Sequence, residues 1–199
     1  MKLLVATTNP GKLREIREII GELPLEMLSL EDVALPPPDE NGVTFHDNAA
    51  AKAIECAAQS GLWTLGDDSG LCVDALGGAP GVRSARYADA DEARRAKLLQ
   101  ALSGLPESRR GAHFFCAVAL AAPDGRRIFR AEGRVDGRIA EQARGTNGFG
   151  YDPLFLPAET AGKTLAELES AEKNRLSHRG RALERLRPLL VRLAQDGAV

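Results

Sequence analysis

The residues best suited to chemistry stand at the start of the stretch Gly66–Tyr87. Asp67, Asp68 and Ser69 follow one another there, and a glycine-rich sequence comes after them. Paired acids beside serine and glycine suit a hard cation such as Mg²⁺, which takes oxygen ligands and usually keeps water and substrate phosphates in its shell. Neighbouring carboxylates also repel each other, which favours a raised pKa for one of them. The alternative is an Asp-rich turn joined to a Gly-Pro turn, without a chemical role.

A second candidate is the segment Thr7–Lys12. An apolar run precedes it and predicts a strand, while apolar residues at helical spacing between positions 13 and 20 follow it and predict a helix. Asn9 is expected to cap this helix and Pro10 to be its first residue. Free backbone N–H groups at the helix start would then form an anion site, to which Lys12 adds a positive charge. The alternative is an ordinary capped helix whose lysine is solvated.

Two later segments have the composition of a nucleobase site. The loop Gly145–Pro153 combines three glycines with two aromatic residues and one aspartate, so it can approach a flat ligand and stack on it. Its alternative is a glycine-rich turn whose aromatic residues fill the core. Further on, Ser177 is expected to cap the last helix, which places His178 and Arg179 at the helix start, with Lys173 nearby. The alternative is a structural role for the histidine.

The remaining pattern predicts the elements that hold these segments. The strongest strand is His113–Ala122, whose near-continuous apolar character is typical of a central strand buried on both faces. In the last helix Pro188 is expected to produce a kink or a shift of one turn. Lys52, in an alanine-rich helix that Thr44 caps, is expected to be solvated. Other strands are predicted at residues 3–6, 25–30, 63–65, 71–73, 127–139 and 154–156. Other helices are predicted from the cap at Thr44 to near Gly61, and at 89–102 and 165–172.

Length and composition restrict the class of protein. A chain of 199 residues with 44% hydrophobic residues is expected to form one domain, or one domain with two lobes. Its net charge of -2 argues against a nucleic-acid binder. The three cysteines are widely spaced, which fits the reducing cytoplasm, and no apolar stretch is long enough for a membrane span.

Four segments, in their order and spacing, closely resemble the Ham1-like inosine/xanthosine triphosphate pyrophosphatases. They are Thr7–Lys12, Asp67–Tyr87, Gly148–Pro153 and Ser177–Gly180, and the likeness covers nearly the whole chain. The resemblance implies an α/β fold with a long twisted mixed sheet and helices around it. It implies a single domain over residues 1–199 whose two lobes flank a nucleotide-binding cleft, and it implies a homodimer.

The same resemblance implies a reaction and a set of site residues. The reaction is Mg²⁺-dependent hydrolysis of dITP, ITP and XTP to the monophosphate and pyrophosphate, which removes non-canonical purines from the nucleotide pool. Asp68 would be the catalytic acid-base and a metal ligand, and Glu40 a second metal ligand. The residues expected to bind the nucleoside triphosphate are Thr7, Thr8, Asn9, Pro10, Gly11, Lys12, Ser69, Phe149, Gly150, Tyr151, Asp152, Lys173, His178 and Arg179.

One position departs from the family pattern. Bacterial members usually carry glutamate where this chain has Asp47, in the segment Phe45-His46-Asp47-Asn48-Ala49, and the shorter side chain is not expected to reach the metal. Two other functions are compatible with the sequence. One is a pyrophosphatase for pyrimidine or other modified nucleoside triphosphates, and the other is a nucleotide-binding protein without catalysis. The acids argue against the second, because a protein that only binds triphosphates has little use for carboxylates near the phosphates unless a metal lies between them.

Overall fold

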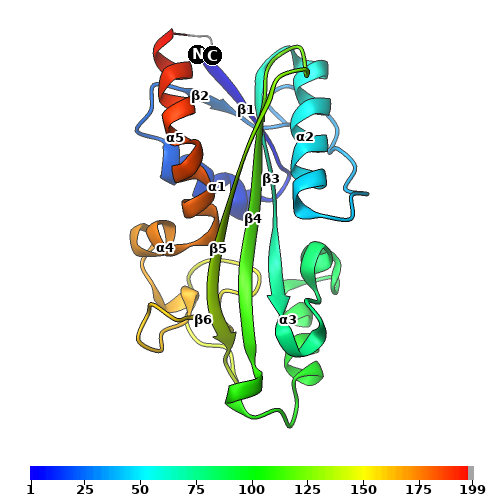
Figure 1. Cartoon of the computed structure of the whole chain (residues 1–199), viewed down its shortest axis with the longest axis vertical. Coiled ribbons are helices and arrows are strands. Elements are labelled where there is room, and N and C mark those ends of the chain that lie inside the picture. The colour runs from blue at the N-terminus through cyan, green and yellow to red at the C-terminus, as the bar shows by residue number, and fades with distance from the viewer. Residues whose placement is uncertain (197–199) are drawn as a thin grey trace. The chain divides into compact units, whose positions relative to one another are not determined.

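The computed structural model describes residues 1–196, and it has the α/β fold expected from the resemblance (Figure 1). The strands are β1 (Lys2–Ala6), β2 (Glu26–Leu28), β3 (Trp63–Val73), β4 (Gly111–Ala121), β5 (Ile128–Ile139) and β6 (Phe155–Pro157). The α-helices are α1 (Pro10–Ile20), α2 (Phe45–Ser60), α3 (Asp91–Ala101), α4 (Ser170–Leu176) and α5 (His178–Asp196). Short 3₁₀ helices occupy Asp74–Leu76, Gly81–Arg86, Glu107–Arg109 and Leu165–Glu167.

Six strands form one sheet in the order β2-β1-β3-β4-β5-β6. β1 pairs in parallel with β2 and with β3, whereas β5 and β6 are antiparallel, so the sheet is mixed as predicted. None of the helices within residues 1–196 combines the length and the apolar character needed to cross a membrane.

The chain divides into two compact units. Unit 1 contains residues 1–68, 116–133 and the chain from residue 179 onward, and unit 2 contains residues 69–115 and 134–178. The three long strands, β3, β4 and β5, each contribute residues to both units. The nucleotide-binding cleft and the single two-lobed domain stay predictions.

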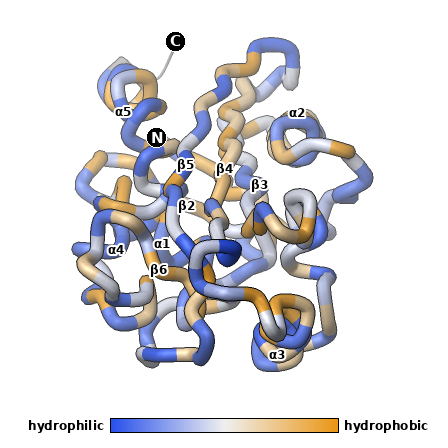
Figure 2. The backbone as a smooth tube through the Cα atoms, turned by 60° about the horizontal axis from the view of Figure 1, so that its bottom comes forward, coloured by the Kyte–Doolittle hydropathy of each residue, from blue (hydrophilic) through white to orange (hydrophobic). Residues whose placement is uncertain are grey.

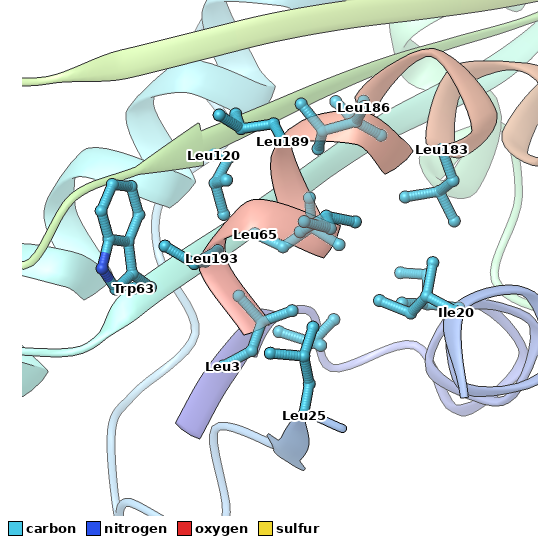
Figure 3. Packing of buried hydrophobic residues seen from close by; sticks show 14 of the residues in the cluster. Leu3, Ile20, Leu25, Trp63, Leu65, Leu120, Leu183, Leu186, Leu189 and Leu193 are labelled. Atoms are coloured by element: carbon cyan, nitrogen blue, oxygen red, sulfur yellow. The ribbon is translucent and has the colours of Figure 1, made fainter. Parts of the chain in front are cut away.

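The core of unit 1 is built around α5. Its leucines at positions 183, 186, 190 and 193 are all buried, as their spacing predicts, and Figure 2 shows hydrophobic and hydrophilic residues alternating along this helix. Pro188 does not displace this pattern by a turn, because it lies on the exposed side of a helix that continues to Asp196. Figure 3 shows the packing of Leu3, Ile20, Leu25, Trp63, Leu65, Leu120, Leu183, Leu186, Leu189 and Leu193.

Unit 2 has its own hydrophobic core, in which the rings of Phe114 and Phe155 meet edge to face at 4.8 Å. The helix predicted over residues 165–172 is wrong in this unit. A 3₁₀ turn stands at its start, closed by a capping box between Thr164 and Glu167. Leu168 and Glu169 are then extended, and α4 begins only at Ser170. Two acidic residues therefore lie at the ends of short elements: Glu167 belongs to the capping box of the 3₁₀ turn, and Glu169 precedes α4.

The acidic pair lies inside a strand. The sequence predicts two short strand-like pieces around it, but β3 runs without interruption from Trp63 to Val73, so the Asp-rich turn is wrong. Gly66 brings this strand against α2. A Cβ atom at Gly66 would lie 2.2 Å from the carbonyl oxygen of Ala49 and 2.9 Å from the nitrogen of Ala53. The missing side chain thus sets the distance between α2 and the residues that follow in β3.

We expect Gly66→Ala to lower the stability of the protein, because the new methyl group meets backbone atoms that cannot rotate away. Overpacking of this kind costs about 1–3 kcal/mol. Urea denaturation followed by circular dichroism measures the change. The control is Ala51→Ser at an exposed position of α2, where the expected change is within about 0.5 kcal/mol. Equal denaturation midpoints for the two variants would show that α2 can move away from Gly66.

Candidate active site

Asp67 and Asp68 occupy adjacent positions of β3 and are both buried, with exposed fractions of 1% and 5%. Successive side chains of a strand point to opposite faces of the sheet. The two carboxylates therefore meet different partners, although they are neighbours in the sequence. Both sets of partners belong to unit 1.

Asp67 is held by two cations. Its carboxylate lies 2.7 Å from Nζ of Lys12 and accepts a hydrogen bond of 2.9 Å from Nε of Arg179. Arg179 in turn pairs with Glu15, and the thiol of Cys116 lies 3.2 Å from the Asp67 carboxylate. Burial alone would raise the pKa of Asp67, but the charges of Arg179 and Lys12 outweigh it and hold this pKa well below its usual range. Asp67 thus stays ionised.

The negative charge of Asp68 is less well compensated by nearby cations than that of Asp67. Its Oδ2 accepts a hydrogen bond of 2.9 Å from the side-chain amide of Asn48, and its Oδ1 lies 3.7 Å from Nζ of Lys52. Burial raises the pKa of Asp68, and the nearby charges of Lys52 and Lys12 offset this only in part. Asp68 is therefore the acid with the raised pKa. The main cause is loss of water contact, whereas the sequence had suggested repulsion between neighbouring acids.

Lys52 links Asp68 to Glu40, the second predicted metal ligand. The Nζ atom lies 2.6 Å from Oε1 of Glu40, and the lysine is only 4% exposed. The prediction that Lys52 is solvated is therefore wrong. Asp47, the position that departs from the family pattern, is exposed and bonds the hydroxyl of Thr44, so it serves as part of the helix cap.

The residues around Lys52 fit a divalent cation only in part. No group of three or more His, Cys, Asp or Glu side chains suited to a metal occurs within the part of the chain that the structure describes. Yet one ammonium group lies near both Glu40 and Asp68, which places two carboxylates around the position of a single cation. Mg²⁺ is commonly bound by one or two carboxylates and completes its shell with water and substrate phosphates. The pair fits that mode of binding.

The predicted anion site stands at the start of α1. Asn9 is the N-cap, as predicted, and its side chain accepts a hydrogen bond of 3.1 Å from the backbone N–H of Lys12. Thr7 in turn accepts one from the backbone N–H of Asn9 at 3.2 Å. The alternative of a solvated lysine is wrong, because the Lys12 side chain is 13% exposed and paired with Asp67. Burial opposes its charge, but Asp67 outweighs it and the Lys12 pKa is raised.

Unit 2 contains the predicted nucleobase loop. One oxygen of Asp152 accepts hydrogen bonds from the backbone N–H of Phe149 at 2.8 Å and from Nζ of Lys173 at 2.5 Å. The same ammonium group lies 5.0 Å from the centre of the Phe149 ring. Gly148 has a φ of +75°, and a Cβ there would lie 2.2 Å from the Asp152 carboxylate. Asp152 and Lys173 are buried, so they fix the position of the half-buried Phe149.

Other predicted residues of this loop have structural partners. Tyr151 is buried and its hydroxyl donates to the carbonyl of Ser84 at 3.0 Å, which supports the alternative that this ring fills the core. Gly150 is held through its backbone, where its N–H donates to Asp91 and its carbonyl accepts from Arg95, both at 2.8 Å.

The predicted residues at the end of unit 2 and the start of α5 also have partners within their own units. The ring of His178 stacks on Phe114 at 4.6 Å with an interplanar angle of 6°. Arg179 is 1% exposed and paired with two carboxylates, which argues against the predicted contact with a base. Ser69 is half-buried in β3, and at the start of α1 Thr8 and Pro10 are exposed while Gly11 is half-buried.

Sequence reasoning missed Asn48 and Lys52 as partners of Asp68. Their spacing of four residues in a predicted helix was the available signal, since it places both side chains on one face. It also missed Glu15, which lies among the polar residues of α1 and is buried against Arg179. No local pattern distinguishes Glu15 from the exposed residues beside it.

Comparison with known proteins gives consistent matches over nearly the whole chain. A family model for the Ham1 family matches residues 3–189. A dITP/XTP pyrophosphatase of an Anaeromyxobacter species is 45% identical over 230 residues, with all of both chains covered. A dITP/XTP pyrophosphatase of Geobacter sulfurreducens is 51% identical over 190 residues and 94% of each chain. The solved structure of a HAM1 protein from Coxiella burnetii matches with a TM-score of 0.85 and 41% identity, over 96% of this chain and 98% of that one.

We expect Arg179→Leu to destabilise the protein strongly, because it leaves Asp67 and Glu15 buried with less positive charge. Loss of one partner from a buried ion pair costs about 3–5 kcal/mol. The control is Arg192→Leu at an exposed position of the same helix, with an expected change within about 0.5 kcal/mol. Both are measured by urea denaturation. A loss below about 1 kcal/mol for Arg179→Leu would mean that Lys12 alone compensates Asp67.

Proposed function

This chain belongs to the Ham1 family, and on that premise we propose that it hydrolyses dITP, ITP and XTP to the nucleoside monophosphate and pyrophosphate. The observation that carries the proposal is Asp68, a buried carboxylate with a raised pKa, placed beside Lys52 and Glu40. The names of the relatives support the substrate class. In a cell this reaction would remove non-canonical purine nucleotides from the nucleotide pool.

The charges of unit 1 support the proposal that the reaction uses a metal ion. Three cations face four carboxylates around β3, which leaves a net charge of −1 when all are ionised. A triphosphate adds several negative charges, and their neutralisation is a main requirement of phosphoryl chemistry. We propose that Asp68 and Glu40 hold Mg²⁺, which supplies this neutralisation when bound. The seven residues are Lys12, Lys52, Arg179, Glu15, Glu40, Asp67 and Asp68.

The protein groups have separate roles in this proposal. The start of α1 binds the phosphates through the segment Thr7–Lys12, where backbone N–H groups and the helix dipole favour anions. Asp68 orients a water molecule and accepts its proton as the water oxygen attacks the α-phosphorus. The bond from that phosphorus to the oxygen that bridges it to the β-phosphate breaks, and pyrophosphate leaves. A raised pKa makes Asp68 a stronger base once it is ionised.

Residues of unit 2 would select the base. Phe149 is the aromatic residue of the loop that remains half-exposed, so we propose that it stacks on the purine. Ser69 and His178 would contribute polar contacts. A site that donates a hydrogen bond to a 6-keto group discriminates against adenine, which presents an amine at that position. The observed contacts of the other predicted loop residues favour a role in positioning the loop over direct contact with the base. These residues are Gly150, Tyr151, Asp152 and Lys173.

The other expected properties stay predictions. A homodimer follows only from the family resemblance. A cytoplasmic location agrees with three free cysteines, two of them buried. The pyrimidine alternative differs from the proposal in substrate choice alone, so a substrate panel separates the two.

We expect pyrophosphate release from dITP and XTP to exceed release from dGTP, dTTP and UTP by at least about 10-fold, because discrimination depends on contacts to the base. Guanine shares the 6-keto group, so dGTP must be rejected through its 2-amino group. The release should stop on addition of EDTA and return with excess Mg²⁺. A coupled assay for pyrophosphate measures all five substrates. Preference for dTTP or UTP would overturn the substrate class, and full activity in EDTA would overturn the metal site.

We expect Asp68→Asn to reduce pyrophosphate release from dITP by about 10²–10⁴-fold, the range typical of a lost general base. The amide is isosteric and keeps a hydrogen-bonding oxygen, so the melting temperature should change little. The matched control is Asp47→Asn, which makes the same change at an exposed cap residue and should keep nearly normal turnover. Near-normal turnover of Asp68→Asn would refute the role of this carboxylate.

A further inference from the structure

Lys52 occupies the position at which the proposed metal site needs a cation. It lies on α2 four residues after Asn48, and only 4% of it is exposed. Its Nζ atom lies 2.6 Å from Glu40 and 3.7 Å from Asp68. Burial of an ammonium group is costly unless the charge is paired, so these two carboxylates hold Lys52 in place.

We propose that Lys52 is the resident cation of the metal site, and that Mg²⁺ enters only together with the triphosphate. The inference rests on the proposed function, since it takes Asp68 and Glu40 as the metal ligands. In the nucleotide-free protein Lys52 compensates both carboxylates. A divalent cation that enters alone would meet the ammonium group at short distance, and like charges repel strongly where water is scarce.

The triphosphate removes this obstacle by offering Lys52 another partner. Phosphate oxygens accept hydrogen bonds from an ammonium group, and the flexible stem of lysine lets its end move between acceptors. When Nζ turns to a phosphate, the two carboxylates lose their cation and bind Mg²⁺ instead. Metal and nucleotide then increase each other's affinity, because such coupling is reciprocal.

A purely structural role for Lys52 makes a different prediction. If the lysine only stabilises the fold, its removal lowers stability and leaves metal binding in the nucleotide-free protein as weak as before. If it competes with the metal, its removal leaves both carboxylates available as metal ligands, and metal binding becomes tighter. Binding of Mn²⁺, a substitute for Mg²⁺ at oxygen ligands, therefore separates the two roles without any turnover.

The test measures Mn²⁺ binding to nucleotide-free protein by electron paramagnetic resonance of the free ion. We expect Lys52→Met to bind Mn²⁺ at least about 10-fold more tightly than the unaltered protein, a change of about 1.4 kcal/mol. The control Lys163→Met removes the same charge at an exposed position of unit 2 and should leave the affinity unchanged. The double variant Lys52→Met/Glu40→Gln should lose the gain, because it removes one of the two ligands.

Circular dichroism first establishes that each variant is folded. If Lys52→Met is not, Lys52→Gln replaces it, since the amide keeps a hydrogen-bond donor for Glu40 without the charge. Equal Mn²⁺ affinity of the unaltered protein and the folded Lys52 variant would overturn the inference, as would a gain that survives loss of Glu40. Either result beside Mg²⁺-dependent turnover of dITP would leave the proposed function intact. Turnover of dITP in EDTA would instead overturn the proposed metal site on which the inference rests.

Discussion

The pairing of Asp67 with Arg179 and Lys12 is the interaction on which the arrangement of unit 1 depends. It joins β3, the start of α5 and the start of α1, which are far apart in the chain. A carboxylate buried at this depth is tolerated only with close positive partners. Each helix start is therefore held against the strand by an ion pair whose loss would strongly lower the free energy of unfolding. Because Lys12 lies in the first turn of α1, the same pairing fixes the end of the helix that is suited to anions.

Strand geometry gives the two adjacent acids of β3 different surroundings. Asp67 and Asp68 are adjacent, so their side chains point to opposite faces of the sheet. On one face two cations keep the Asp67 pKa well below its usual range. On the other face burial outweighs the more distant lysines and raises the pKa of Asp68. The pKa values of the two neighbouring carboxyl groups are thus shifted in opposite directions.

Local signals made much of the fold predictable. Asn9 and Thr44 cap their helices as expected, and the leucine spacing of α5 identifies its buried face. Tertiary contacts could not be read in the same way. Arg179 and Asp67 are 112 residues apart, and no sequence pattern pairs them. The burial of Lys52 could not be predicted, because a buried lysine depends on a carboxylate partner. That partner is Glu40, which lies in a loop whose course is not set by periodicity.

The family resemblance identified Asp68 but could not show how its charge is balanced. Each of the four carboxylates Glu15, Glu40, Asp67 and Asp68 has a cation beside it. A triphosphate bound at these residues would have to exchange partners with groups that are already paired. Such exchange would lower the affinity for an anion alone, because the free energy lost with the broken ion pairs offsets the free energy gained from the new ones. It would favour a ligand that supplies anionic oxygens to the cations and a divalent cation to the carboxylates, because that combination gives both members of each broken ion pair a new partner.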